Sequence, residues 1–174
     1  MLSVITMGNF FNFEKMVLLI IHLNGLNNML IQFNKLWVNH PYPSNPCDKT
    51  LFANQCAIRM GVSLEASGID ISSFDKMYPQ RRCYPGLKHT PRHILAAQEL
   101  ANWIDSANCT FVGNKQVLKN DALSVLKDKK GIIFIMNGWG STDHIDLWDG
   151  EYLKAGDPDW LNLGEQIWFW EMSA

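Results

Sequence analysis

The stretch GIIFIMNGWGSTDHIDLWDG, residues 131–150, decides the fold because its side chains follow the period of β-strands. Residues 131–139 are β-branched and aromatic and are bounded by glycines, which predicts a buried strand. Residues 144–150 alternate polar and apolar side chains, which predicts a strand with two chemically different faces. A third strand is predicted over residues 166–172, QIWFWEM.

The chain upstream of these strands carries helical patterns. Apolar spacing predicts a short helix over residues 30–38. Small and apolar residues then predict a helix that Asn54 caps and that stops at Ser67–Gly68. Further helices are predicted over residues 94–104 and 114–127. Helices first and strands afterwards favour an α+β fold, with helices packed on a small antiparallel sheet.

The composition is that of one ordinary globular domain. The chain has 174 residues, of which 47% are hydrophobic and 18% charged, enough for a substantial core. The net charge of −2 and the pI near 6.2 come without any dense basic run. We therefore expect no nucleic-acid partner.

The N-terminal segment predicts an extension ahead of the domain. The apolar run of residues 16–21 is too short to span a bilayer, which takes roughly 20 apolar residues. It also lacks the basic leading region and the small-residue cleavage site of a signal peptide. We expect residues 1–28 to form an extension, residues 29–174 a single domain, and no integral membrane segment.

The cysteines predict neither a disulfide scaffold nor a metal site. Their spacing lacks the paired C-x-x-C pattern of structural zinc sites, and no H-E-x-x-H or comparable spacing occurs. We therefore expect no metal and no cofactor, and the sequence leaves open whether one cysteine pair is oxidised. Three histidines are expected in loops or at helix caps: His40, His89 and His93.

Cys56 and His144 are the candidate reactive pair. A thiol attacks carbonyl groups as a thiolate, and a helix N-terminus or a neighbouring imidazole lowers its pKa. Cys56 stands in the first turn of a predicted helix, and His144 begins a strand whose polar face also carries Asp146. On spacing alone, a free cysteine on an apolar helix face is more often a buried packing residue than a nucleophile.

Five blocks of sequence carry a resemblance to a known family. They occur in the family's order within residues 31–171 and read IQFNKLWVNHP, NQCAIRMGVSL, HTPRHILAAQELANWI, GIIFIMNGWGSTDHIDLWDG and IWFWE. In these blocks the chain resembles the family-four amidase effectors of type VI secretion. The resemblance implies a papain-like, NlpC-type cysteine peptidase fold. It also implies a DL-endopeptidase that cleaves peptidoglycan stem peptides between γ-D-glutamate and meso-diaminopimelate.

The resemblance carries over to individual residues. It makes Cys56 the nucleophile, with Nδ1 of His144 as base and then acid. The family also has an aspartate roughly a dozen residues after the histidine. Lys154 and Ala155 stand near that spacing here, and the first aspartate is Asp157. We expect Asp157 to orient the imidazole; the alternative is Asp146, which shares a strand face with His144.

The sequence offers several candidates for the groups that contact the oxyanion and the substrate. The backbone N–H of Cys56 is the natural oxyanion donor, and the side chain of Gln55 or Asn54 is a further candidate. Trp139 lies in a glycine-rich segment and is expected to wall a substrate groove, with core packing as the alternative.

The resemblance also implies partners and a place of action. It implies delivery by a type VI system into the periplasm of a competing bacterium, and a dimeric immunity protein that obstructs the groove. Two other functions stay open: an inactive cell-wall or partner-binding module on the same fold, and a different thiol enzyme such as an acyltransferase or a deamidase.

Overall fold

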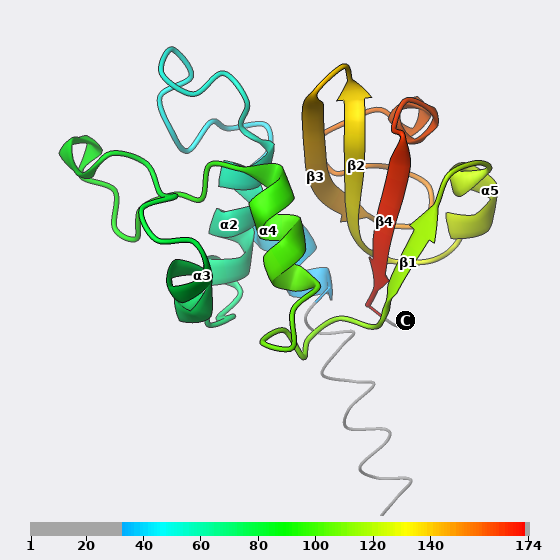
Figure 1. Cartoon of the computed structure of the whole chain (residues 1–174), viewed down its shortest axis with the longest axis horizontal. Helices are drawn as coiled ribbons and strands as arrows, with labels where there is room; N and C mark the ends of the chain where they lie inside the picture. The colour runs from blue at the N-terminus through cyan, green and yellow to red at the C-terminus, as the bar shows by residue number, and fades with distance from the viewer. Residues whose placement is uncertain (1–32, 173–174) are drawn as a thin grey trace, which may run out of the picture.

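The computed structural model describes residues 33–172, which form an α+β domain (Figure 1). Helices α2, α3 and α4 lie on one side of a four-stranded sheet, and α5 lies on the other. The strand order is β1-β4-β2-β3, and all neighbouring strands are antiparallel. The α+β prediction is confirmed. The predicted extension, residues 1–28, lies outside the described residues. Within residues 33–172 no helix has the length and apolarity to cross a membrane.

The three predicted strands are present as β2 (Gly131–Trp139), β3 (Thr142–Trp148) and β4 (Gln166–Glu171). The central strand β2 pairs with β3 on one side and with β4 on the other, so that Ile133 lies between Asp146 and Phe169. Among residues 33–172, β3 pairs with no further strand apart from an isolated bridge between Trp148 and Leu153, and it forms one edge of the sheet.

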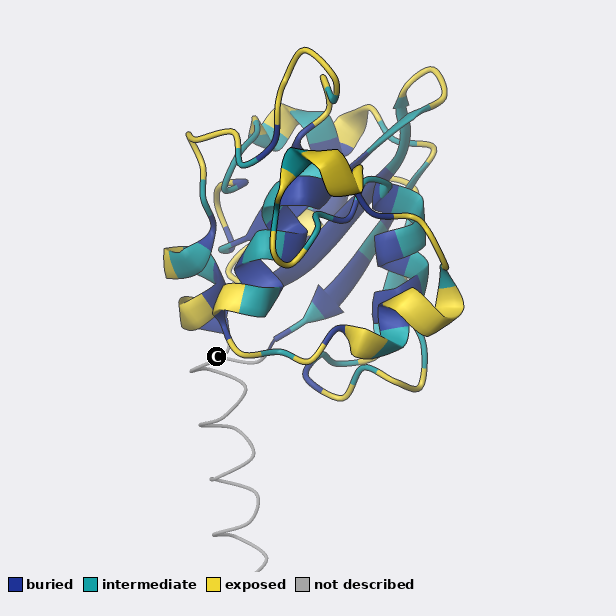
Figure 2. Ribbon diagram, turned by 90° about the vertical axis from the view of Figure 1, so that its left-hand side faces the viewer, coloured by how far each residue is buried: buried dark blue, intermediate teal, exposed yellow. Residues whose placement is uncertain are grey.

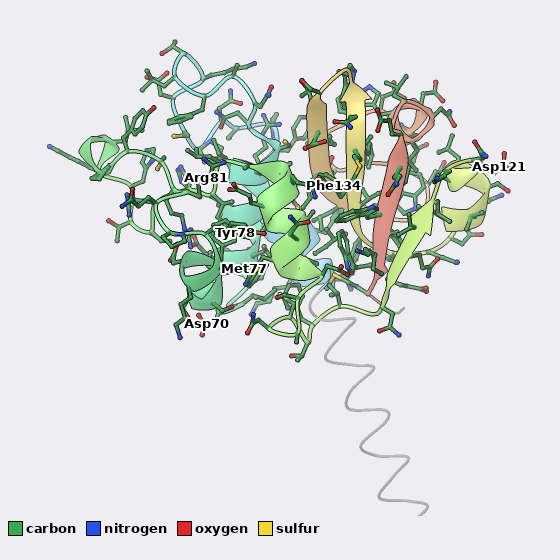
Figure 3. All side chains as sticks on the ribbon, viewed as in Figure 1. Asp70, Met77, Tyr78, Arg81, Asp121 and Phe134 are labelled. Atoms are coloured by element: carbon green, nitrogen blue, oxygen red, sulfur yellow. The ribbon has the colours of Figure 1, made fainter. Side chains whose placement is uncertain are left out.

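The helix predicted over residues 114–127 is wrong in its first half. Residues there form strand β1 (Lys115–Leu118), and only the second half is helical, as α5 (Ala122–Leu126). Every residue of β1 pairs with the outer edge of β4, and this pairing accounts for the difference. Such pairing overrides a weak local helical pattern. Asp121, with a φ of 54°, separates the two elements (Figure 3).

Three helices precede the sheet: α2 (Cys56–Ala66), the unpredicted α3 (Ser72–Met77) and α4 (Ala97–Ile104). Residues 33–39 are also helical. Helix α2 ends as predicted, with Ser67 as its C-cap and Gly68 at a φ of +82°. Helix α4 begins three residues later than the sequence pattern indicates. Two short 3₁₀ helices complete the chain, η1 (Pro85–Leu87) and η2 (Pro158–Asn162).

Both faces of the sheet are buried (Figure 2). Helices α2 and α4 pack on one face, over apolar side chains such as Phe134 and Leu147 (Figure 3). Helix α5 and η2 cover the other face, over Ile133 and Trp148. The Ser63 hydroxyl of α2 donates to the Leu36 carbonyl oxygen at 2.7 Å, which ties α2 to the helix of residues 33–39. This packing fixes the start of α2 against the edge strand β3.

The start of β2 tolerates only glycine. A Cβ on Gly131 would lie 2.1 Å from the Trp170 carbonyl oxygen and 2.9 Å from the Phe169 ring. We expect Gly131→Ala to lower the free energy of unfolding by about 3 kcal/mol, because neither the backbone nor the ring can move cheaply. The measurement is urea denaturation followed by circular dichroism.

Gly86→Ala is the matched control, since a Cβ there meets no heavy atom within 4 Å. Its stability should stay within about 0.5 kcal/mol of wild type. Equal stabilities for the two variants would contradict the close approach of β2 and β4.

Candidate active site

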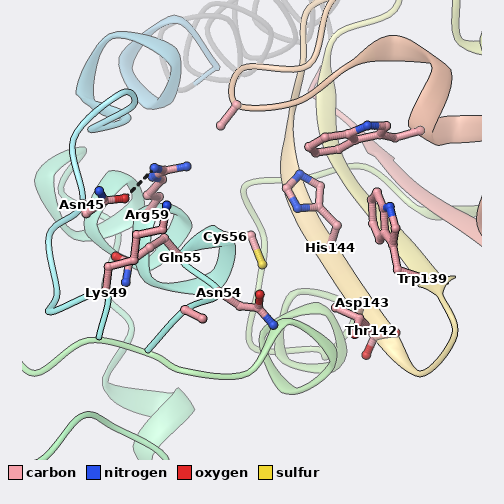
Figure 4. Close-up of a pocket in the computed structure, with 13 residues that line it drawn as sticks. Asn45, Lys49, Asn54, Gln55, Cys56, Arg59, Trp139, Thr142, Asp143 and His144 are labelled. Atoms are coloured by element: carbon pink, nitrogen blue, oxygen red, sulfur yellow. Dashed lines mark hydrogen bonds between the residues drawn. The ribbon is translucent and has the colours of Figure 1, made fainter. Parts of the chain in front are cut away.

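A groove of about 380 Å³ lies between the start of α2 and the edge of the sheet (Figure 4). The proline-rich loop before α2 forms one wall, and the β2–β3 hairpin with the segment after β3 forms the other. The residues that line it are Asn45, Lys49, Ala53, Asn54, Gln55, Cys56, Arg59, Trp139, Thr142, Asp143, His144, Ala155 and Trp160. The groove thus brings together the predicted Cys56, His144, Gln55 and Trp139.

Cys56 is the first residue of α2. The N-cap is Gln55, so the prediction that Asn54 caps the helix is wrong by one residue. The Gln55 side chain makes no cap hydrogen bond; its amide donates to the Phe52 carbonyl oxygen at 2.6 Å, and its oxygen accepts from the Cys47 N–H at 3.4 Å. Gln55 therefore braces the preceding loop, while Asn54 stays exposed in the groove.

The environment of Cys56 favours its thiolate. Burial alone would raise the pKa of the thiol, but the hydrogen bond and charge of His144 and the backbone N–H groups of Ile145 and Ala57 outweigh it. The pKa of Cys56 lies below its ordinary value as a result. Ile145 belongs to the edge strand, so its N–H is free to face α2 instead of another strand.

His144 shows the complementary shift. Burial would lower its pKa, but hydrogen bonds to Asp146 and Cys56, together with their charges, raise the pKa to about 9. Nε2 of the ring lies 3.3 Å from Oδ2 of Asp146. This contact leaves Nδ1 for the thiol, which is the nitrogen that the sequence analysis assigned to Cys56. The lowered pKa of Cys56 and the raised pKa of His144 both favour a thiolate beside an imidazolium.

Asp146 is fully buried and contacts polar groups with both of its oxygens. Oδ1 accepts the Leu147 N–H at 2.9 Å, and Oδ2 accepts the Ala155 N–H at 2.8 Å. The two backbone donors hold the carboxyl group rigidly toward His144, two residues earlier on the same strand face.

Asp157, the preferred third member in the sequence analysis, is elsewhere. It is the N-cap of η2, its side chain is exposed, and its Oδ1 accepts the Asp159 N–H at 2.9 Å. The segment that was expected to supply an aspartate does reach the site, but it contributes the backbone N–H of Ala155 to Asp146. The carboxyl group beside His144 therefore comes from β3 itself.

The sequence analysis placed His40 in a loop or at a helix cap and did not identify its contact with the site. It is buried, and its Nε2 lies 3.7 Å from Oδ1 of Asp146. Burial lowers the pKa of His40 to about 4, so the ring is neutral near pH 7. The Tyr42 N–H donates to Nδ1 at 3.3 Å, which puts the ring proton on Nε2, facing the carboxyl group. Only its position in a proline-rich loop was visible in the sequence.

Two tryptophans wall the groove around His144. Trp139 is 41% exposed and stands edge-on to the imidazole at 6.2 Å between ring centroids. Trp160 of η2, which the sequence analysis did not single out, lies 5.2 Å from His144 and 5.0 Å from Trp139. A bulge in β2 between Ile135 and Trp139 directs the indole into the groove.

The groove holds no group of metal-ligating side chains among the described residues. The side chains of residues 33–172 that converge as metal ligands are Cys47, Cys83, His89 and His93, and none of them lines the groove. The chemistry of the groove is that of a thiol and an imidazole.

Comparison with protein families agrees with this chemistry. The family model for Tae4, the type VI secretion system amidase effector protein 4, matches residues 52–170, more than half of the chain. The chain belongs to the Tae4 family. It is therefore a secreted hydrolase of the amidase class, and the resemblance described from the sequence is confirmed. No curated protein sequence matches the chain.

Solved Tae4 structures share the fold. Tae4 from Salmonella Typhimurium, in complex with Tai4, is 20% identical, with a TM-score of 0.59 over 79% of this chain and 94% of that one. The same effector in complex with Tai4 from Enterobacter cloacae gives 19% identity and a TM-score of 0.60, over 82% and 98%. The E. cloacae Tae4–Tai4 complex gives 18% and 0.53, over 81% and 95%. The predicted NlpC-type fold is thereby confirmed.

The opposite pKa shifts of Cys56 and His144 predict a pH profile for alkylation. Thiolate exists above the depressed pKa of Cys56 and is lost as the pH falls through it. In His144→Ala the burial of the thiol persists without the imidazole, so the pKa rises and the profile moves to higher pH. We expect iodoacetamide to label Cys56 at pH 7 at least roughly tenfold more slowly in the variant.

Peptide mass spectrometry measures labelling at each cysteine. Cys109 is the internal control, because burial raises its pKa to about 12 and it should stay unlabelled in both proteins. Superimposable pH profiles for Cys56 in wild type and variant would show that the thiol and the imidazole do not interact.

Proposed function

We propose that this Tae4-family effector hydrolyses the amide between γ-D-glutamate and meso-diaminopimelate in peptidoglycan stem peptides. The observation that carries the proposal is the coupled pair of Cys56 and His144, with opposite pKa shifts, in a groove open to solvent. Family membership supports amide hydrolysis as the reaction. The bond itself is inferred from the sequence resemblance.

The mechanism follows from the positions of the two groups. The Cys56 thiolate attacks the γ-carbonyl carbon, and the carbonyl oxygen becomes an oxyanion. The backbone N–H of Cys56 at the helix start is suited to stabilise it, and the exposed Asn54 amide is the nearest side-chain candidate. His144 donates its Nδ1 proton to the leaving amine, and the C–N bond breaks. The resulting thioester is then hydrolysed by water, which His144 deprotonates.

We assign the orienting role to Asp146 in preference to Asp157. The hydrogen bond from Nε2 of His144 fixes the tautomer with Nδ1 directed to Cys56. His40 supports Asp146 from its other side, as a positioning residue without contact to the thiol. The arrangement supplies the third member of a Cys–His–Asp mechanism from the same strand as the histidine.

One wall of the groove carries positive charges that suit an anionic substrate, and Asp143 is the one carboxylate among the residues that line the groove. Lys49 and Arg59 line the wall opposite His144, and the guanidinium of Arg59 is held by the Ser44 carbonyl oxygen at 3.0 Å and by Asn45 at 2.9 Å (Figure 4). A stem peptide presents free carboxylates next to the γ-linkage. A fixed guanidinium and a lysine on this wall provide attraction for them.

The place of action and the protein partner follow from the same assignment. Peptidoglycan lies in the periplasm, so we propose that the effector acts there in a recipient bacterium. The three Tae4 structures compared above are complexes with Tai4 proteins. We propose a cognate immunity protein for this chain, dimeric and covering the groove.

The test of the reaction is mass spectrometry of peptidoglycan fragments incubated with the wild type and with Cys56→Ala. We expect only the wild type to release a product with a new amine on diaminopimelate, because the variant has no nucleophile. Circular dichroism of the variant should match wild type, since Cys56 is only partly exposed and the smaller alanine fits the first turn of α2.

The other outcomes separate the remaining functions. Binding of sacculi without new amines would replace the proposal by an inactive binding module. Loss of ammonia from a side-chain amide would indicate a deamidase, and transfer of the acyl group to an added amine an acyltransferase. Turnover by Cys56→Ala would remove Cys56 from the mechanism.

Asp146→Asn and Asp157→Asn form a matched pair of variants. We expect Asp146→Asn to lower kcat roughly a hundredfold or more, because the amide no longer fixes the imidazole tautomer or raises the pKa of His144. Asp157→Asn should stay within about twofold of wild type. A steady-state assay on a defined tetrapeptide, with a pH profile for each variant, ranks the two. A larger loss in Asp157→Asn would reverse the assignment.

A further inference from the structure

We propose that Cys47, Cys83, His89 and His93 bind one zinc ion in a structural site outside the groove. One ligand atom from each of the four side chains lies within 4.8 Å of all the others. Both cysteines are buried and both histidines are partly buried. The ligands come from two long loops: the proline-rich loop, above the start of α2 in Figure 1, and the connection between α3 and α4, to the left of α2.

Two of the distances between ligand atoms match the edges of a tetrahedral zinc centre. Nδ1 of His89 lies 3.5 Å from Sγ of Cys83 and 3.7 Å from Sγ of Cys47. With Zn–S bonds of about 2.3 Å and Zn–N bonds of about 2.0 Å, the sulfur–nitrogen edge of a tetrahedron is about 3.6 Å. The rings of His89 and His93 are 4.3 Å apart between centroids, so both face the same small volume.

Hydrogen bonding does not account for the cluster. Nδ1 of His89 has one lone pair or one proton, so it can bond to only one of the two thiols beside it. Nδ1 of His93 is buried without a hydrogen-bond partner in the described structure. Buried polar groups are rarely left unpaired in this way, and a group that is left unpaired often marks an ion.

The backbone holds the ligands in place. Cys83 and His93 face each other across a short antiparallel contact, in which the Cys83 N–H donates to the His93 carbonyl oxygen at 2.9 Å. The His93 N–H in turn lies 3.2 Å from Sγ of Cys83. An N–H directed at sulfur stabilises the thiolate that a metal requires, and such outer contacts accompany structural metal sites.

The donor set selects zinc. Two thiolates and two neutral imidazoles give a neutral complex with Zn²⁺, and binding releases the two thiol protons. Thiolate and imidazole together prefer zinc over the hard cations calcium and magnesium. His89 and His93 have the H-x₃-H spacing common in such sites, but the two cysteines lie far apart in the sequence. This proposal replaces the expectation, based on spacing, that the chain binds no metal.

A disulfide between Cys47 and Cys83 is the rival use of these thiols in an oxidising compartment. A disulfide would need neither histidine, and it would leave two imidazoles converging on a bond that has no donor or acceptor capacity for them. The presence of both rings therefore favours the metal.

The site also bears on the groove. The Cys47 N–H donates to the side chain of Gln55, the N-cap of α2, and both cysteines pack against Ile58 of that helix. A metal that joins the two loops would hold the chain that leads into Cys56.

The experiment measures zinc in the full-length chain. All proteins carry Cys56→Ala, so that the Cys56–His144 pair cannot take up metal, and are purified with reductant and without chelator. We expect elemental analysis and native mass spectrometry to find one zinc per chain. The zinc should remain in Cys109→Ser, a matched cysteine outside the cluster, and fall to background in Cys83→Ser and in His93→Ala.

A second measurement keeps the test decisive where a variant does not fold. Removing zinc with a chelator should lower the Tm of the Cys56→Ala protein by more than roughly 5 °C, and adding zinc should restore it. Two results would overturn the proposal. One is a protein that stays zinc-free after incubation with equimolar Zn²⁺ and gel filtration. The other is a Cys47–Cys83 disulfide in protein isolated from the periplasm. Neither depends on amidase activity.

Discussion

The chemistry of the site depends on one constraint: the Cys56 thiol and the His144 imidazole must meet at the outer edge of β3. The backbone N–H groups of an inner strand bond to its two neighbouring strands. Because β3 is an edge strand, the Ile145 N–H can bond to the thiol instead. The first turn of α2 must then lie against that edge. The apolar face of the helix, packed on Ile145 and Leu147, supplies the free energy that holds it there.

The parts of the fold that were predictable are those whose signal is local. Strands β2, β3 and β4 carry their period and their β-branched and aromatic residues within their own few residues, and α2 carries its stop at Gly68. Strand β1 was missed because its conformation depends on pairing with the distant edge of β4. The convergence of Cys47 with Cys83 was missed for the same reason, since no local spacing shows that two loops meet.

The residues of the site were predicted on three grounds: the chemistry of thiols and imidazoles, the resemblance to a known family, and the geometry of a strand. The resemblance to known amidases selected Cys56 and His144, and the structure brings both into one groove. Their catalytic roles stay predictions until turnover is measured. The resemblance favoured Asp157 as the third group by allowing a small difference in loop length, but that side chain caps η2 and its Oδ1 accepts the Asp159 N–H. The simple rule that residues i and i+2 of a strand share a face pointed to Asp146, the group that contacts the imidazole.

The buried carboxyl group of Asp146 has two histidines beside it, and their pKa values shift in opposite directions. Both imidazoles approach it, yet the pKa of His144 rises to about 9 while that of His40 falls to about 4. His144 gains a second partner in the Cys56 thiolate, which stabilises its positive charge. Burial lowers the pKa of His40, and the positive charges of Lys154, Arg59 and His144 lower it further. Protonating its Nδ1 would also break the hydrogen bond from the Tyr42 N–H. Two charged imidazoles would compete for one carboxyl group. The two rings contact different oxygens of Asp146: neutral His40 lies beside Oδ1, and His144 lies beside Oδ2. The backbone N–H of Ala155 also donates to Oδ2, from the segment that was expected to bring its own aspartate.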